Sequence, residues 1–135
     1  MREIPRTSEP LLVRTDFSNE IAWRALVHEA SQGYEDDFRA NLHFVDDKSF
    51  DGTEPVDIAS AAKSTGHPVL FVADGTTLSN AEHLVLCISL HGLGSFRVPP
   101  NELWSIENNL SLANMDFEEF AEAVDPDGVF RGFPH

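Results

Sequence analysis

The sequence predicts a single α/β domain with a mixed sheet of about five strands and helices on both faces. Apolar segments of strand length alternate with segments in which apolar residues recur at helical spacing. The run Val69–Ala73 is continuously apolar, which is typical of a strand buried on both of its faces. A chain of 135 residues with 41% hydrophobic residues suits one domain with a sizeable core.

The first half of the chain predicts a β-α-β-α order after a polar, proline-containing start. Residues 1–10 are expected to form a flexible arm, and Asp16 and Ser18 are suitable caps for the first helix. The expected elements are a strand over residues 11–15, a helix over about 19–30, a strand over 38–45 and a short helix over 55–63.

The second half predicts a third strand, a β-hairpin and terminal helices. Two capping-box patterns occur, at residues 79–82 and 116–119, and each indicates the start of a helical turn. The expected elements are strands over 69–73, 84–90 and 95–98, helices over 102–112 and 117–124, and a short edge strand over 129–133.

This order of elements also predicts how the strands pair. Strands joined through helices are expected to be parallel, with right-handed crossovers, whereas the hairpin adds antiparallel strands. The whole chain, residues 1–135, is therefore expected to fold as one α/β domain.

The charge of the chain restricts its partners. Nine basic and 23 acidic residues give a formal net charge of −14, which argues against binding nucleic acid or anionic lipid. A basic protein or a small ligand suits this surface better. Cys87 is the one cysteine, so no internal disulfide can form, and no apolar run has signal-peptide or membrane-spanning length. We expect a cytoplasmic protein, either a monomer or a homodimer.

Four aspartates follow the first three predicted strands. Because the carboxyl ends of parallel strands meet at one edge of a sheet, they are expected to gather where open α/β sheets bind ligands. Asp16, Asp47 and Asp74 are the candidate catalytic residues, and all four, with Asp46, are candidate ligands for Mg²⁺ or Ca²⁺. The alternative, which we favour, is that they cap helices and form turns.

A second group of candidate residues is rich in amides. An amide both donates and accepts hydrogen bonds, a tryptophan offers an apolar wall, and an arginine holds an anion. The candidate ligand-binding residues are Arg97, Trp104, Glu107, Asn108, Asn109 and Asn114. Alternatively, the amides satisfy buried backbone groups where helices meet, and the arginine pairs with an acidic residue.

Several common catalytic motifs are missing from the sequence. There is no nucleophile elbow, no phosphate-binding Walker loop and no dinucleotide-binding glycine motif. The chain has no lysine after Lys63, which argues against the phosphoacceptor chemistry of receiver domains despite the acidic edge.

Three strings resemble a known family. They are LLVRTDF from residue 11, LFVAD from residue 70 and ELWSIENNLSLANMDFEEF from residue 102. Together they are similar to a family of small actinobacterial proteins classed as a domain of unknown function, over roughly residues 11–133. The resemblance implies no activity and no catalytic residues.

These observations favour a soluble acidic binding or protein-interaction module over an enzyme. The alternatives are a small hydrolase or lyase that uses an aspartate at the sheet edge, and a domain that binds a divalent metal. The metal alternative requires at least three of the four acids within coordination reach.

Overall fold

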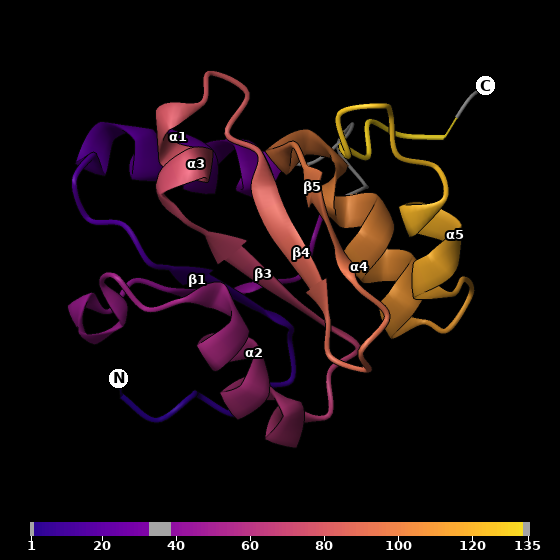
Figure 1. Cartoon of the computed structure of the whole chain (residues 1–135), viewed down its shortest axis with the longest axis horizontal. Coiled ribbons are helices and arrows are strands. Elements are labelled where there is room, and N and C mark those ends of the chain that lie inside the picture. Colours follow the sequence, from indigo (N-terminus) through magenta and orange to yellow (C-terminus); the bar gives the residue numbers. More distant parts are fainter. Residues whose placement is uncertain (1, 33–38, 134–135) are drawn as a thin grey trace.

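The computed structural model describes residues 2–32 and 39–133, and its centre is a five-stranded mixed sheet (Figure 1). The strand order is β2-β1-β3-β4-β5. The first strand is parallel to β2 and β3, whereas β4 is antiparallel to β3 and β5. The strands are β1 (Leu11–Arg14), β2 (His43–Val45), β3 (Val69–Ala73), β4 (Val85–Ser89) and β5 (Ser95–Val98). The predicted mixed sheet, with parallel strands followed by an antiparallel hairpin, is confirmed.

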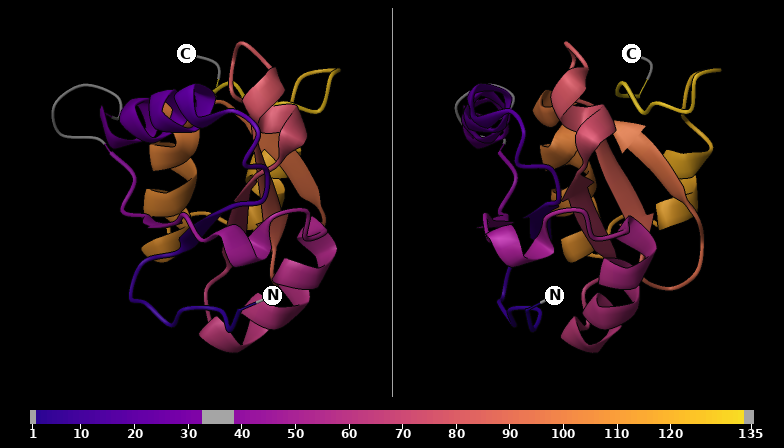
Figure 2. Two further views of the ribbon diagram at one scale, coloured as in Figure 1. Left: turned by 90° about the vertical axis from the view of Figure 1, so that its left-hand side faces the viewer. Right: turned by 60° about the vertical axis from the view of Figure 1, so that its left-hand side comes forward.

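Helices cover both faces of this sheet (Figure 2). They are α1 (Glu20–Gln32), α2 (Pro55–Ala62), α3 (Gly75–Ser79), α4 (Leu103–Ser111) and α5 (Phe117–Ala121). One core cluster contains residues of α1, α4 and α5, and a second, on the other face, contains residues of α2. We call these faces the α1 face and the α2 face.

The central strands contribute side chains to both clusters in alternation, because successive residues of a strand point to opposite faces. Leu12 and Phe71 lie in the cluster of the α1 face, whereas Val13, Leu70 and Val72 lie in the cluster of the α2 face. All five residues of β3 are buried. The expectation that this strand is buried on both faces is confirmed.

Aromatic side chains fix α5 and the C-terminal segment against the sheet. The ring centroids of Phe96 and Phe117 are 5.3 Å apart, and those of Phe120 and Phe130 are 5.2 Å apart. The backbone of Arg97 exchanges hydrogen bonds with Gly128 and Phe130. The predicted edge strand over 129–133 is therefore wrong in extent, because its pairing is one isolated bridge between Arg97 and Val129.

Two helix starts differ from the predictions. The first helix is capped by Asn19, whose Oδ1 accepts from the Ala22 N–H at 3.0 Å, rather than by Asp16 or Ser18. The predicted helical turn at residues 79–82 is wrong, since α3 ends at Ser79. Its capping box lies earlier, between Asp74 and Thr77, where we expected a turn. The capping box of α5, at Asp116 and Glu119, is confirmed.

Three element lengths also differ. The second strand has three residues instead of the predicted eight, and residues 33–38, which include the start of that prediction, lie outside the described part. Helix α5 ends at Ala121 rather than at residue 124. Residues 48–50, expected as a turn, form a single 3₁₀ turn capped by Asp47.

The N-terminal residues 2–10 form neither a helix nor a strand, but several contacts attach them to the domain. Ile4 is 8% exposed and lies in the cluster of the α2 face. The ring Nε2 of His67 is 2.9 Å from the carbonyl oxygen of Thr7.

Candidate functional site

All four predicted acids follow the parallel strands at one edge of the sheet, as expected. Asp46 and Asp74 directly follow β2 and β3, and Asp16 and Asp47 are one residue further from the ends of β1 and β2. The side chain of Asp16 packs against the start of α3: a Cβ at Gly75 would lie 3.0 Å from Asp16 Oδ2. The Asp16 carboxylate and the start of α3 thus lie side by side beyond the ends of β1 and β3.

A buried arginine holds part of this edge together. Arg14 is 1% exposed, and its Nη1 donates to Glu20 Oε2 at 2.8 Å and to Asp46 Oδ1 at 3.1 Å. The guanidinium also lies over the rings of Phe17 and Trp23, with its carbon 4.2 Å and 5.3 Å from their centroids. Asp46 is thus an ion-pair partner of an arginine, in line with the pairing expected for an arginine inside an apolar strand.

Asp74 makes a bidentate ion pair with Arg97. Arg97 Nη1 and Nη2 donate to Asp74 Oδ1 and Oδ2, each at 2.8 Å, and the Thr77 N–H donates to Oδ1 at 3.0 Å. Burial alone would raise the pKa of Asp74, but the hydrogen bonds from Arg97 and Thr77 outweigh it, so the pKa lies below its ordinary value. The carboxylate is therefore charged, and the arginine is neutralised by it.

Asp16 and Asp47 are also held in the charged form. The Ser18 hydroxyl and N–H both donate to Asp16 Oδ1 and lower its pKa. The Ser49 N–H donates to Asp47 Oδ1 at 2.9 Å and lowers the pKa of Asp47, and Arg2 lies 3.2 Å from Oδ2. A general acid needs a raised pKa, so these carboxyls lack that property.

The four aspartates do not meet the requirement for a metal site. Within residues 2–32 and 39–133, which include all four, no group of three or more histidine, cysteine, aspartate or glutamate side chains is arranged to hold a metal ion. Asp46, Asp47 and Asp74 each pair with an arginine, and Asp16 and Asp47 accept hydrogen bonds from serines in local turns.

The amide-rich helix α4 uses its polar side chains to hold nearby backbone. Glu107 is 3% exposed; its Oε1 accepts from the Asn41 N–H at 2.5 Å, and its Oε2 accepts from the Ser111 hydroxyl at 2.6 Å. Asn108 Nδ2 donates to the carbonyl oxygen of Arg39 at 3.1 Å. The bonds to Asn41 and Arg39 attach α4 to the segment that leads into β2. This is a structural role of the kind weighed as the alternative, although the backbone held belongs to a connecting segment and not to a second helix.

The remaining candidates of this group are spread over different surroundings. Asn109 Nδ2 donates to the Ser105 carbonyl within the helix, Asn114 is exposed in the turn after it, and Trp104 is partly buried. Arg97 lies on the opposite face of the sheet, because its neighbours Phe96 and Val98 point into the cluster of the α1 face, where α4 packs. The structure therefore does not bring Arg97 together with the α4 side chains.

Two grooves lie on either side of the hairpin turn between β4 and β5, away from the acidic edge. None of the four aspartates lines them. The first, which we call the α2 groove, has a volume of about 450 Å³ and is lined by Pro55, Val56, Ala59, Ser60, Lys63, Leu86, Ile88, Ser89, Gly92, Gly94 and Ser95. The second, the α5 groove, has a volume of about 220 Å³ and is lined by Pro68, His91, Leu93, Leu110, Ala113, Met115, Asp116, Phe117 and Glu118.

The α5 groove combines apolar surface with carboxylates. Leu93, at the hairpin turn, is 48% exposed, and the buried side chain of Phe117 also lines the groove. Asp116 and Glu118 lie at the start of α5, and both are exposed. Glu118 makes no side-chain hydrogen bond or ion pair with the described residues, so its charge is available to a partner.

Sequence reasoning missed both grooves. The segment His91–Gly94 was interpreted simply as a hairpin turn. Its one signal was Leu93, an apolar residue at the centre of a turn where polar residues are usual. Cys87 is fully buried in β4, and burial raises the pKa of its thiol.

The comparisons with known proteins give a family but no activity. Residues 9–133 match a family model described as "Domain of unknown function (DUF6924)". No curated protein matches the chain. Within the described residues, no helix is long and apolar enough to cross a membrane.

Proposed function

The chain belongs to the family described as domain of unknown function DUF6924, which implies no activity. From the site, we propose that the protein is an interaction module that binds a basic, partly apolar segment of a partner protein. The observation that carries the proposal is the α5 groove, where an exposed leucine and an unpaired carboxylate border the same hollow. A partner helix or loop with both apolar and basic side chains complements that surface.

The overall charge supports this partner class. With a net charge of −14, the domain attracts a cationic segment at long range and accelerates its encounter. The exposed carboxylates of Glu118 on α5 and of Glu122, directly after that helix, add to the local negative potential. The proposal keeps the cytoplasmic location expected from the sequence.

The enzyme and metal alternatives have weaker support. A hydrolase or lyase built on Asp16, Asp47 or Asp74 requires a carboxyl that gives or takes a proton near neutral pH. The pKa of each is lowered by its hydrogen bonds, and two of the three also lie beside an arginine. An Mg²⁺ or Ca²⁺ site requires several carboxylate oxygens around one point, and no such group occurs in the described residues.

The test is a binding titration with a defined probe. A fluorescent amphipathic peptide, with leucines on one face and lysines on the other, is titrated with the protein and followed by anisotropy. The matched control peptide carries glutamine in place of each lysine. The variants are Leu93→Ser and Glu118→Gln in the groove, with Ile21→Ser and Glu54→Gln as controls for an exposed apolar side chain and an exposed carboxylate elsewhere.

We expect the lysine peptide to bind more tightly than the glutamine peptide, with an affinity that falls as salt is raised. Leu93→Ser is expected to weaken binding about tenfold and Glu118→Gln about threefold, since one exposed charge contributes roughly 1 kcal/mol or less. Equal affinities for all four variants would overturn the proposed face. Equal binding of the two peptides would overturn the proposed partner class.

A further inference from the structure

The α2 face of the sheet is covered over only part of its width. Helix α2 packs over β1 and β3, where Leu70 and Val72 are at most 1% exposed. Over β4 the side chains of Leu86 and Ile88 are only partly buried. The α2 groove is lined by residues of this open part of the sheet and of α2.

The walls of the groove are mainly apolar. Leu86 and Ile88 form the floor, and Val56 and Ala59 form the wall on α2, where Val56 is 67% exposed. On the hairpin side, the groove is bordered by Gly92 and Gly94, which have no side chains. The space beside them is open, because a Cβ built on either glycine would meet no atom within 4 Å. The volume of about 450 Å³ falls within the roughly 300–1,000 Å³ typical of small-molecule pockets.

A lysine without an ion pair lies at the C-terminal end of α2. Lys63 lines the groove and is exposed, and no carboxylate of the described residues lies within salt-bridge distance of it. By contrast, Arg14, Arg97 and Arg131 all bind carboxylates. The groove thus places an available positive charge next to apolar surface, although the protein as a whole is strongly acidic.

Two hydroxyl groups add hydrogen-bonding capacity. Ser60 on α2 and Ser95 on β5 line the groove, and their side chains make no hydrogen bond with the described residues. A hydroxyl can donate to a carboxylate oxygen, so both can act together with the Lys63 ammonium.

We propose that the α2 groove binds a small aliphatic carboxylate, with the hydrocarbon chain on Leu86, Ile88 and Val56 and the carboxylate at Lys63. The apolar lining favours a hydrocarbon body, and the lysine selects a negative head group. The site is separate from the α5 groove and does not depend on the protein-interaction function.

The test uses octanoate as the probe, with octanol and octylamine as neutral and cationic controls of the same chain length. Binding is followed by two-dimensional NMR of the isotope-labelled protein. The variants are Lys63→Met, which keeps much of the side-chain length but removes the charge, and Val56→Glu, which places a like charge in the wall. Both positions are exposed, so both variants are expected to fold, and a thermal melt checks this.

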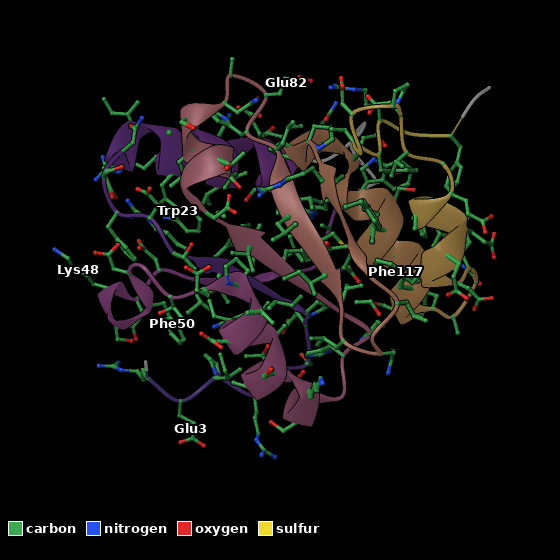
Figure 3. The ribbon with its side chains drawn as sticks, in the orientation of Figure 1. Glu3, Trp23, Lys48, Phe50, Glu82 and Phe117 are labelled. Atoms are coloured by element: carbon green, nitrogen blue, oxygen red, sulfur yellow. The ribbon has the colours of Figure 1, made fainter. Side chains whose placement is uncertain are left out.

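Two matched controls change similar side chains elsewhere. Lys48→Met removes the charge of another lysine, which points into solvent (Figure 3). Ile21→Glu adds a carboxylate at an apolar residue of α1 that is 82% exposed.

Octanoate is expected to shift the resonances of Leu86, Ile88 and Lys63 with a Kd on the order of 1 mM, given its small number of atoms. Octanol and octylamine are expected to bind at least about fivefold more weakly, and Lys63→Met to weaken octanoate binding about fivefold. Val56→Glu is expected to weaken it further, and the two control variants to leave it unchanged. The proposal is overturned if octanoate shifts no groove resonance. It is also overturned if the Lys63→Met variant binds both octanoate and octanol with the affinity that the natural protein has for octanoate.

Discussion

The two ends of the sheet use their residues in different ways. At the carboxyl edge, charged groups neutralise one another: Arg14 binds Glu20 and Asp46, and Arg97 binds Asp74. At the hairpin end, apolar and charged side chains stay accessible, as Leu93, Val56 and Lys63 illustrate. The carboxyl edge has more of the candidate residues that the sequence singles out, but these residues mainly bind one another.

The reason is the strand order. The second and third strands, β2 and β3, lie on opposite sides of β1. The strand order therefore reverses between β1 and β3, which makes this the switch point of the sheet. Such a point binds a ligand when a crevice is open there. Here α3 begins at this point, and a Cβ on Gly75 would lie only 3.0 Å from Asp16 Oδ2. The acids gather where the rule predicts, but their carboxylates bind other groups of the protein.

The largest predicted effect is at Arg14. We expect Arg14→Ala to lower the free energy of unfolding by about 3 kcal/mol, because it removes a fully buried side chain that packs on Phe17 and Trp23 and pairs with two carboxylates. Urea denaturation measures the change. Arg24→Ala, which removes an exposed partner of Glu20, is the control and is expected to cost under about 0.5 kcal/mol. Similar losses for both variants would contradict a structural role specific to Arg14.

The next effect is at Asp74, and it depends on pH. Asp74→Asn is expected to cost about 2 kcal/mol at pH 7, because the amide cannot accept both Arg97 donors. The pKa of Asp74 is lowered in the folded protein, so its stabilisation is complete above the ordinary value near 3.8 and is lost as the pH falls through the folded value.

Unfolding curves at several pH values test this directly. The difference between the natural protein and the Asp74→Asn variant is expected to be constant around neutral pH and to narrow below about pH 4. A difference that widens on acidification would contradict the assigned direction of the pKa shift.

Glu107 is expected to show a smaller effect. Glu107→Gln keeps one carbonyl oxygen for the Asn41 N–H but turns an amide towards the Ser111 hydroxyl, so we expect a loss of about 1 kcal/mol. Hydrogen exchange at the Asn41 amide measures the same contact locally. A variant with faster exchange at Asn41 and little change elsewhere supports the structural role, whereas unchanged exchange there would contradict it.

The smallest effect is predicted at Asp16. Asp16→Asn retains an oxygen that can accept from the Ser18 N–H and hydroxyl, so the free energy of unfolding is expected to change by less than about 0.5 kcal/mol. A thermal melt measures it. A loss of several degrees would mean that the negative charge itself, rather than the local turn, stabilises this edge.

Local patterns in the sequence predicted much of the fold. The apolar run Val69–Ala73 and the hairpin over residues 84–98 appear as expected, because alternation and burial leave a direct trace in the residue types. The helical turn expected at residues 79–82 failed, because Asp74 competes with a capping box earlier in the same segment. In the capping box that forms, Thr77 is buried and its hydroxyl also donates to the carbonyl oxygen of Leu84 at 2.8 Å.

The site was less predictable than the fold. The acids of the carboxyl edge were placed correctly, but their partners come from other elements: Arg97 on β5 meets Asp74 after β3. The grooves were not visible in the sequence, because each is formed by segments that are distant along the chain, such as Pro68, Leu93 and Met115. Spacing along one element carries no information about such a surface.

The central claim is that ligands and partners bind at the hairpin end and not at the acidic edge. The most direct measurement is the pattern of NMR shift changes when the labelled protein is titrated with the lysine peptide. The account predicts changes at Leu93, Leu110 and Met115, with Asp16 and Asp74 unaffected. Changes centred on Asp16 and Asp74, with the α5 groove silent, would contradict it.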